Sequence, residues 1–128
     1  MNFQFLIIDD CEPVIAVYTQ LLNQAGHTVH SLPSCDGALQ HIIATQPDCV
    51  LCDLMLPGMD GLEFFYMIRK EKIKQPVFIV ISAKHFDFDR RQALNAGVDA
   101  YITKPVDHAT FASDVVKIIQ DKNLHHKK

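Results

Sequence analysis

The sequence predicts an α/β protein in which five short parallel strands alternate with five helices in a doubly wound arrangement. Short apolar runs recur along the chain between turn-forming residues, which is typical of strands buried on both faces of a sheet. Between these runs, apolar residues follow the i, i+3, i+4, i+7 spacing of amphipathic helices. Two of the runs also end abruptly in aspartate. The carboxyl ends of parallel strands share one edge of the sheet, where such proteins hold their chemistry.

The chain begins with a predicted strand over residues 4–9, which ends in two aspartates. Pro13 suits the first turn of the helix that follows, and Gly26 is expected to end that helix. A short strand covers residues 28–31, and Ser34 is expected to cap a second helix that stops before a proline. The residues expected to face inward are Val14, Val17, Tyr18, Leu21 and Leu22 in the first helix and Cys35, Ala38, Leu39, Ile42 and Ile43 in the second.

The second half of the chain continues the alternation without a linker, repeat or low-complexity tract. Asp60 is expected to cap the third helix, Gly97 to end the fourth, and the fifth to begin at about Asp107. We therefore expect one domain over residues 1–123 and a short polar tail over 124–128. The predicted strands cover residues 49–53, 77–81 and 100–103, and the predicted helices cover residues 60–72, 86–96 and 107 onward.

Size and composition exclude several classes of protein. A chain of 128 residues that is 48% hydrophobic and 21% charged can bury the core of a globular domain, which excludes disorder. The formal net charge of −3, with lysine and arginine scattered, argues against a nucleic-acid-binding surface. No apolar run reaches the length of a membrane span, and the first four residues lack the basic flank of a secretory signal. We expect a cytoplasmic protein that binds neither nucleic acid nor membrane directly.

The four cysteines do not predict a metal or redox centre. Cys49 and Cys52 form a C-x-x-C sequence, which in isolation suggests a redox pair or half of a zinc site. Residues three apart on a strand point to opposite faces of the sheet, so these two sulfurs cannot meet at one metal ion. Cys11 and Cys35 complete no ligand spacing. All four cysteines are therefore interpreted as buried free thiols.

Polar residues follow four of the five predicted strands, and these residues carry a family resemblance. They are Asp9 and Asp10 after the first strand, Asp53 after the third, Ser82 after the fourth and Lys104 after the fifth. With their surroundings they resemble the receiver domain of two-component response regulators, including chemotaxis receivers. The resemblance spans essentially the whole chain and implies a flavodoxin-like fold with strand order 2-1-3-4-5. The segments that carry it are Ile7 to Asp10, Asp53 to Gly61, Ile81 to Ala83 and Ala96 to Pro105.

The implied strand order brings the carboxylates of Asp9, Asp10 and Asp53 together, and such a cluster needs positive charge. At separations of about 5–6 Å, each pair repels by about 3 kcal/mol at an effective dielectric constant near 20. Either a carboxyl group stays protonated or a hard cation binds. Oxygen ligands without histidine or cysteine favour Mg²⁺, or Mn²⁺, over zinc. The resemblance implies direct metal contacts from Asp10, Asp53 and the backbone carbonyl of Met55, with Asp9 acting largely through water.

The resemblance also implies roles in phosphoryl transfer. Asp53 is the expected nucleophile, which accepts a phosphoryl group from a phosphohistidine of a sensor histidine kinase or a histidine phosphotransfer protein. Lys104 and Ser82 are expected to donate hydrogen bonds to the phosphoryl oxygens. Ser82 and Tyr101 are the expected switch residues, which remodel the face formed by the fourth helix, fifth strand and fifth helix for a downstream protein. The family also places a cis peptide bond before Pro105.

The expected activity is that of a signalling switch and not of a metabolic enzyme. Met55 and Lys84 occupy positions at which family members tune the lifetime of the phosphoryl group, and Met55 offers no acid or amide to orient water. Slow self-dephosphorylation is therefore expected. Phe86 and Phe88, at the start of the fourth helix, are candidates for partner contacts or for ordinary packing. The protein is expected to be a monomer or weak dimer, either free-standing, a relay intermediate or part of a longer chain.

Three other classes of protein use similar residues. A phosphatase of the haloacid dehalogenase type needs an acid two residues after its aspartyl nucleophile, and Cys11 and Met55 hold those positions here. A flavodoxin needs a Gly-, Ser- and Thr-rich loop for phosphate after the first strand, where this chain is acidic. The principal alternative is a degenerate receiver that acts as an interaction module without phosphorylation. Degenerate members usually lack some of the five site residues, all of which this chain has.

Overall fold

The structure is a computed structural model, and it describes residues 1–84 and 86–126 of the chain. The strands are β1 (Gln4–Ile8), β2 (Thr28–Leu32), β3 (Cys49–Asp53), β4 (Val77–Ser82) and β5 (Ala100–Thr103). The helices are α1 (Glu12–Gln24), α2 (Ala38–Thr45), α3 (Gly61–Arg69), α4 (Asp87–Ala96) and α5 (Phe111–His126). The five strands form one parallel sheet in the order β2-β1-β3-β4-β5. The α/β architecture and the strand order expected from the sequence are confirmed.

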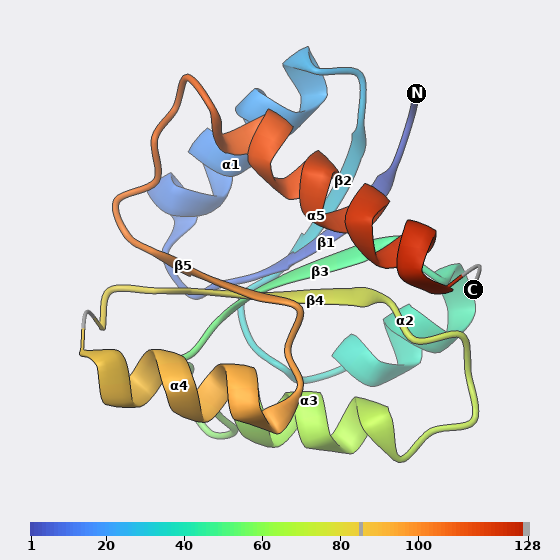
Figure 1. Ribbon diagram of the computed structural model, residues 1–128, viewed down its shortest axis with the longest axis vertical. Helices are drawn as coiled ribbons and strands as arrows, with labels where there is room; N and C mark the ends of the chain where they lie inside the picture. The colour runs from blue at the N-terminus through green and yellow to red at the C-terminus, as the bar shows by residue number, and fades with distance from the viewer. Residues whose placement is uncertain (85, 127–128) are drawn as a thin grey trace.

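The sheet separates two hydrophobic cores. Figure 1 shows α1 and α5 on one face of the sheet and α2, α3 and α4 on the other. Alternate residues of each strand enter different cores, so Cys49 packs with residues of α1 and α5 whereas Cys52 packs with residues of α2 and α3. The prediction that these two sulfurs point to opposite faces is confirmed. The interpretation of all four cysteines as buried is wrong for Cys11, which is exposed, and for Cys35, which is partly exposed.

The third helix has the N-terminus that the sequence predicts. The side chain of Asp60 accepts a hydrogen bond from the backbone N–H of Glu63 at 2.9 Å, and the Glu63 carboxylate accepts one from the N–H of Asp60 at 3.4 Å. This reciprocal pair is a capping box. The helix ends at Arg69 and not at about residue 72. The fourth helix ends at Gly97, as predicted, with a left-handed backbone conformation.

Two predicted helix starts are wrong, because the residues expected to begin these helices form turns instead. The Ser34 hydroxyl accepts a hydrogen bond from the N–H of Asp36 at 3.2 Å, so Ser34 closes a turn and α2 begins only after Gly37. The Asp107 carboxylate likewise accepts from the N–H of Ala109 at 2.9 Å, ahead of the start of α5. Ile43 was expected to face inward, but it lies on the outer side of the shorter α2 and is exposed.

Gly61 lets the third helix approach the end of β3 closely. Its backbone N–H donates to the carbonyl of Leu54 at 3.0 Å, and a Cβ atom at this position would lie 2.5 Å from the carbonyl oxygen of Asp53. Any other residue would push the helix away from the strand end, because that neighbour is backbone and cannot move aside. Gly61 therefore fixes the segment that carries Asp53 against α3.

The last helix runs past the predicted domain boundary, because residues 124–126 continue α5. The remaining part of the predicted polar tail, Lys127 and Lys128, lies outside the described residues. Within the described part of the chain, no helix is both long enough and apolar enough to cross a membrane.

Candidate functional site

Three aspartates converge at the carboxyl ends of β1 and β3. These strands are neighbours, with Ile8 paired to Cys52, so the residues that follow them meet at the same edge of the sheet. Asp9, Asp10 and Asp53 each place one carboxylate oxygen within 4.8 Å of the others. Asp9 is buried, Asp53 is partly exposed and Asp10 is exposed. The convergence that the two acid-terminated strands predicted is therefore present.

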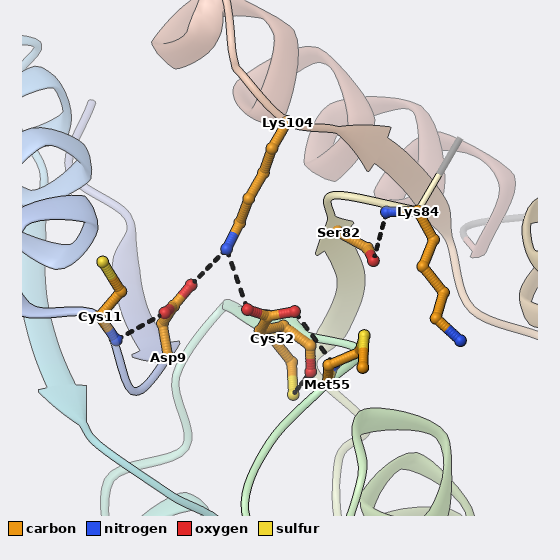
Figure 2. A network of polar contacts seen from close by, with 8 residues as sticks. Asp9, Cys11, Cys52, Met55, Ser82, Lys84 and Lys104 are labelled. Carbon is orange, nitrogen blue, oxygen red and sulfur yellow. Dashed lines mark hydrogen bonds and ion pairs between the residues drawn. The ribbon is translucent and has the colours of Figure 1, made fainter.

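Lys104 joins two of the three aspartates. Its Nζ atom donates to Asp9 Oδ2 at 3.0 Å and to Asp53 Oδ2 at 2.9 Å, and Figure 2 shows its side chain reaching across the strand ends toward Asp9. Burial by itself lowers the pKa of Lys104, but the hydrogen bonds to the Asp53 and Asp9 carboxylates outweigh burial and raise it. The ammonium group thus stays charged and neutralises part of the acidic cluster.

Backbone N–H groups hold the remaining oxygens of the two bridged carboxylates. Asp9 Oδ1 accepts from the N–H of Cys11 at 2.9 Å, and Asp53 Oδ1 accepts from the N–H of Met55 at 3.0 Å. Each carboxylate therefore has one oxygen fixed by its own loop and the other held by Lys104. Asp10 does not cap α1, because the N-cap residue is Cys11 and no side-chain cap is formed there. Asp10 is exposed, and one of its carboxylate oxygens lies within 4.8 Å of an oxygen of each of the other two aspartates.

Ser82 and Tyr101 both contact the backbone of Lys84. The fully buried Ser82 hydroxyl accepts from the N–H of Lys84 at 3.1 Å, as Figure 2 shows, and the Tyr101 hydroxyl donates to the carbonyl of Lys84 at 3.0 Å. Tyr101 is only 5% exposed, so it is part of the core. The two predicted switch residues are thereby connected through one backbone segment at the end of β4.

The donor set at this site fits a hard divalent cation. Three carboxylates with converging oxygens, no histidine and no thiolate are the ligands that Mg²⁺ and Mn²⁺ prefer. Asp10 is exposed and forms no ion pair among the described residues, whereas Asp9 and Asp53 are both paired with Lys104, so an ion bound to Asp53 would share its carboxylate with that ammonium group. A contribution from the Met55 carbonyl stays a prediction. The peptide bond between Lys104 and Pro105 is cis, as the resemblance implied.

An apolar cleft beside Lys104 was not anticipated from the sequence. It has a volume of about 510 Å³ and lies between α1 and the segment after β5. Tyr18, predicted only as a core residue, lines this cleft, and burial raises its pKa to about 12. The helical spacing of Tyr18 could place it inward but could not show that its hydroxyl lies near the charged residues of the site. The remaining lining residues are Pro13, Val14, Val17, Ala83, Pro105, Val106 and His108.

The two phenylalanines at the start of α4 are surface residues. Phe86 is 76% exposed and Phe88 is 71% exposed, which excludes ordinary packing. Phe88 also lines a groove with Tyr66 of α3 and Arg91 of α4. The side of α4 that faces α3 therefore also exposes apolar surface. The family resemblance had indicated a different partner-binding face, formed by α4, β5 and α5.

Comparisons with known proteins place this site in a family context. The sequence profile of the response regulator receiver domain matches residues 5–116. The chain is 32% identical over 105 residues to the alkaline phosphatase synthesis transcriptional regulatory protein PhoP of Bacillus subtilis, and the match covers 82% of this chain and 43% of that protein. The chain thus spans less than half the length of this relative.

Solved structures agree in fold. A CheY-like response regulator receiver domain protein from Methanospirillum hungatei has a TM-score of 0.86 and 24% identity, with 98% of this chain and 99% of that chain covered. A two-component response regulator from Clostridium difficile has a TM-score of 0.85 and 22% identity, with 94% and 98% covered. At 22–24% identity, the similarity to these two structures shows that this chain has the same fold and nothing further.

Proposed function

The chain belongs to the response regulator receiver domain family of two-component signal transduction, and we propose that it is a phosphorylation-dependent switch with Asp53 as the phosphoacceptor. The observation that carries the proposal is the bridging of Asp9 and Asp53 by Lys104 at one edge of the sheet. This arrangement supplies a carboxylate nucleophile and a fixed cation beside it. Phosphoryl transfer depends mainly on such positioning and charge neutralisation.

In the proposed reaction, a carboxylate oxygen of Asp53 attacks the phosphorus of a phosphohistidine on a sensor histidine kinase or a histidine phosphotransfer protein. The new oxygen–phosphorus bond forms as the phosphorus–nitrogen bond breaks, and the electron pair returns to the imidazole of the donor. Lys104 keeps its proton and hydrogen-bonds to the phosphoryl oxygens as negative charge gathers there. Mg²⁺ held by Asp10 and Asp53, with the Met55 carbonyl and Asp9 in support, would supply further positive charge.

The proposed switch follows from the contacts of Ser82 and Tyr101. A phosphoryl group on Asp53 offers new acceptors to the Ser82 hydroxyl, which at present accepts from the Lys84 backbone. Movement of Ser82 would remove its hydrogen bond to the Lys84 N–H, and Tyr101 contacts the carbonyl of the same residue. The change would reach a downstream protein through the face of α4, β5 and α5. For the output we propose only that the switch binds a downstream protein. The chain spans less than half the length of its transcriptional relative, so no transcriptional role is proposed.

The experiment that tests the proposal is phosphorylation by a small phosphodonor. Purified protein is incubated with acetyl phosphate and Mg²⁺, and its intact mass is measured with and without a chelator. We expect the gain of one phosphoryl group that depends on Mg²⁺ and disappears in Asp53→Asn but not in the matched variant Asp48→Asn. A gain that survives in Asp53→Asn would place the site elsewhere.

The lifetime of the phosphorylated form separates this switch from a phosphatase. Met55 is 61% exposed and has no acid or amide to orient an attacking water. Slow hydrolysis is therefore proposed, and a half-life of seconds in buffer with Mg²⁺ would contradict it. If no phosphoryl gain occurs with any donor, the alternative of an unphosphorylated interaction module is favoured, and the exposed Phe86 and Phe88 are its first candidate contacts.

A further inference from the structure

Two histidines from neighbouring elements face each other at the edge of the sheet. His30 lies in β2, the edge strand, between Val29, which packs against the core of α1 and α5, and Ser31. Leu32 packs against the core on the α2 side, and residues two apart on a strand share a face, so the His30 side chain also points toward α2. His41 lies in α2, and the two ring centroids are 5.4 Å apart with the ring planes tilted by 59°.

The His41 ring has a nitrogen atom that the protein leaves without a partner. Among the described residues, His41 Nε2 is the one buried side-chain nitrogen or oxygen that forms no hydrogen bond. A buried polar atom of this kind lowers the stability of the fold unless water or an ion satisfies it. The neighbouring His30 is exposed, so its side chain can change rotamer without disturbing the core.

We propose that His30 and His41 form a second metal site, which binds a transition-metal ion such as Zn²⁺. Imidazole nitrogens suit Zn²⁺, Ni²⁺ and Cu²⁺, whereas the carboxylates of the acidic cluster suit Mg²⁺. An imidazole nitrogen lies about 2.0–2.1 Å from a bound Zn²⁺, so two imidazoles on one tetrahedral ion have ring centres roughly 5 Å apart. The separation of 5.4 Å is close to that value, and the rings need to turn but the backbone does not need to move.

The two histidines contribute differently to this site. His30 is exposed and meets the ion from solvent, whereas His41 supplies a nitrogen that otherwise has no partner. In the part of the chain that the structure describes, the acidic cluster is the one group of three or more converging ligands, so water completes the coordination of an ion at the two histidines. Binding through two protein ligands is reversible, unlike binding in the closed four-ligand sites of structural zinc.

The bound ion joins an edge strand to a short helix. The strand β2 pairs only with β1, and α2 has eight residues, so a link between them adds a constraint at the margin of the fold. At a concentration about 100 times its Kd, an ion that binds only the folded chain lowers the equilibrium constant for unfolding about 100-fold. The site shares no residue with the acidic cluster, and it is independent of the function proposed for Asp53.

The location of the site is tested by chemical modification of histidine. Protein in excess Mg²⁺, which competes for the acidic cluster, is treated with diethyl pyrocarbonate with and without Zn²⁺, and peptide mass identifies the modified residues. At a Zn²⁺ concentration about 10 times its Kd, mass action leaves about one tenth of His30 free, so its modification should slow about tenfold. The exposed His108 should react equally in both conditions. Protection of His30 that persists in His41→Gln, or no protection at all, would overturn the proposal.

The number of bound ions is tested by calorimetric titration with Zn²⁺ in the same excess of Mg²⁺. We expect the number of Zn²⁺ ions bound per chain to fall by one in His30→Gln and in His41→Gln, and to stay unchanged in the matched variant His108→Gln. Urea unfolding without Zn²⁺ checks that each variant is folded, and if His41→Gln does not fold, the exposed His30→Gln decides the result. An unchanged number of bound ions in His30→Gln would overturn the proposal, whether or not Asp53 is phosphorylated.

Discussion

The two ends of the sheet use charged residues in opposite ways. At the amino end, Asp48 and Asp99 each accept a hydrogen bond from the backbone of a neighbouring strand. Asp48 Oδ2 accepts from the N–H of Gln4 at 2.7 Å, and Asp99 Oδ2 accepts from the N–H of Phe78 at 2.8 Å. Lys122 pairs with the same Asp99 oxygen at 3.1 Å. These carboxylates accept from N–H groups near the starts of β1 and β4 and stabilise the sheet.

At the carboxyl end, three aspartates lie close together and one lysine pairs with two of them. Lys104 bridges Asp9 and Asp53, and Asp10 forms no ion pair within the described part of the chain. Net negative charge therefore remains at this end, which costs stability and creates affinity for cations. The comparison shows that identical residue types stabilise one end of the sheet and leave the other with unbalanced negative charge. Five predictions test this contrast.

The largest effect is expected from removing the lysine at each end. Lys104→Met should slow phosphorylation by acetyl phosphate about 100- to 1,000-fold, because a positioned donor to developing charge is worth about 2.7–4 kcal/mol. Lys122→Met should leave the rate unchanged, since Lys122 contacts only the amino end. Intact-mass time courses measure both variants. Equal losses would show that the two ends are not functionally distinct.

Magnesium should stabilise the protein through the carboxyl end only. At a concentration about 100 times its Kd, an ion that binds only the folded state adds about 2.7 kcal/mol to the free energy of unfolding. Urea unfolding with and without Mg²⁺ measures the gain. We expect it to vanish in Asp10→Asn and to persist in Asp99→Asn. A gain that Asp10→Asn retains would exclude Asp10 as a ligand.

At the amino end, removal of a carboxylate should destabilise the fold. Asp99→Ala removes the side-chain acceptor of the Phe78 N–H and the carboxylate acceptor of the Lys122 ammonium group, which keeps only the Pro76 carbonyl at 3.5 Å. We expect a loss of about 2 kcal/mol in the free energy of unfolding, as for hydrogen bonds to charged groups. The phosphorylation rate of the folded variant should not change. A stability equal to that of the unsubstituted protein would mean that water replaces the carboxylate at no cost.

At the carboxyl end, removal of a carboxylate should have the opposite sign. Asp10→Asn relieves repulsion in the metal-free protein and should raise the free energy of unfolding by about 1 kcal/mol at low salt. The gain should shrink in about 1 M salt, where charges are screened beyond about 3 Å. Urea unfolding at the two salt concentrations measures it. Destabilisation by Asp10→Asn would contradict the description of this end as electrostatically strained.

The smallest effect concerns pH and the amino end. His27 Nδ1 accepts from the N–H of Phe3 at 3.0 Å, and burial lowers the pKa of His27. Below the unfolded pKa of about 6.5, the unfolded chain binds more protons at this residue than the folded chain does. Stability should therefore fall as pH drops from about 6.5 toward the lowered folded pKa. Urea unfolding across this range should show a weaker dependence in His27→Gln, and an unchanged slope would exclude His27 as the cause.

Patterns that depend on local residues predicted the structure well. Asp60 and Glu63 form the capping box because both partners lie within one helical turn. The strand ends were predictable because apolar runs stop at Asp9 and Asp53. The prediction that Ser34 caps α2 was wrong for an equally local reason. Its hydroxyl accepts from the N–H of Asp36, two residues later in a turn, and not from an N–H of the helix. The strand order came from the family resemblance, because right-handed crossovers alone leave several orders open.

Contacts between distant segments could not be predicted from the residues. Cys35, in the loop after β2, packs against the same core as Cys52 of β3 and donates to the carbonyl of Met59, and no sequence spacing indicates these contacts. Tyr18 was correctly expected to face inward, but its position beside Lys104 depends on how α1 and the end of β5 lie across the sheet. Periodicity gives the direction of a side chain and not the residues that it meets.

The bridge made by Lys104 gives the molecule an internal counter-ion. Because one ammonium already offsets two carboxylates, the acidic edge can fold and persist while the supply of divalent ions fluctuates. An incoming divalent cation would compete with a tethered amine for the Asp53 carboxylate. The reach of the Lys104 side chain would then influence how tightly the acidic cluster holds such an ion.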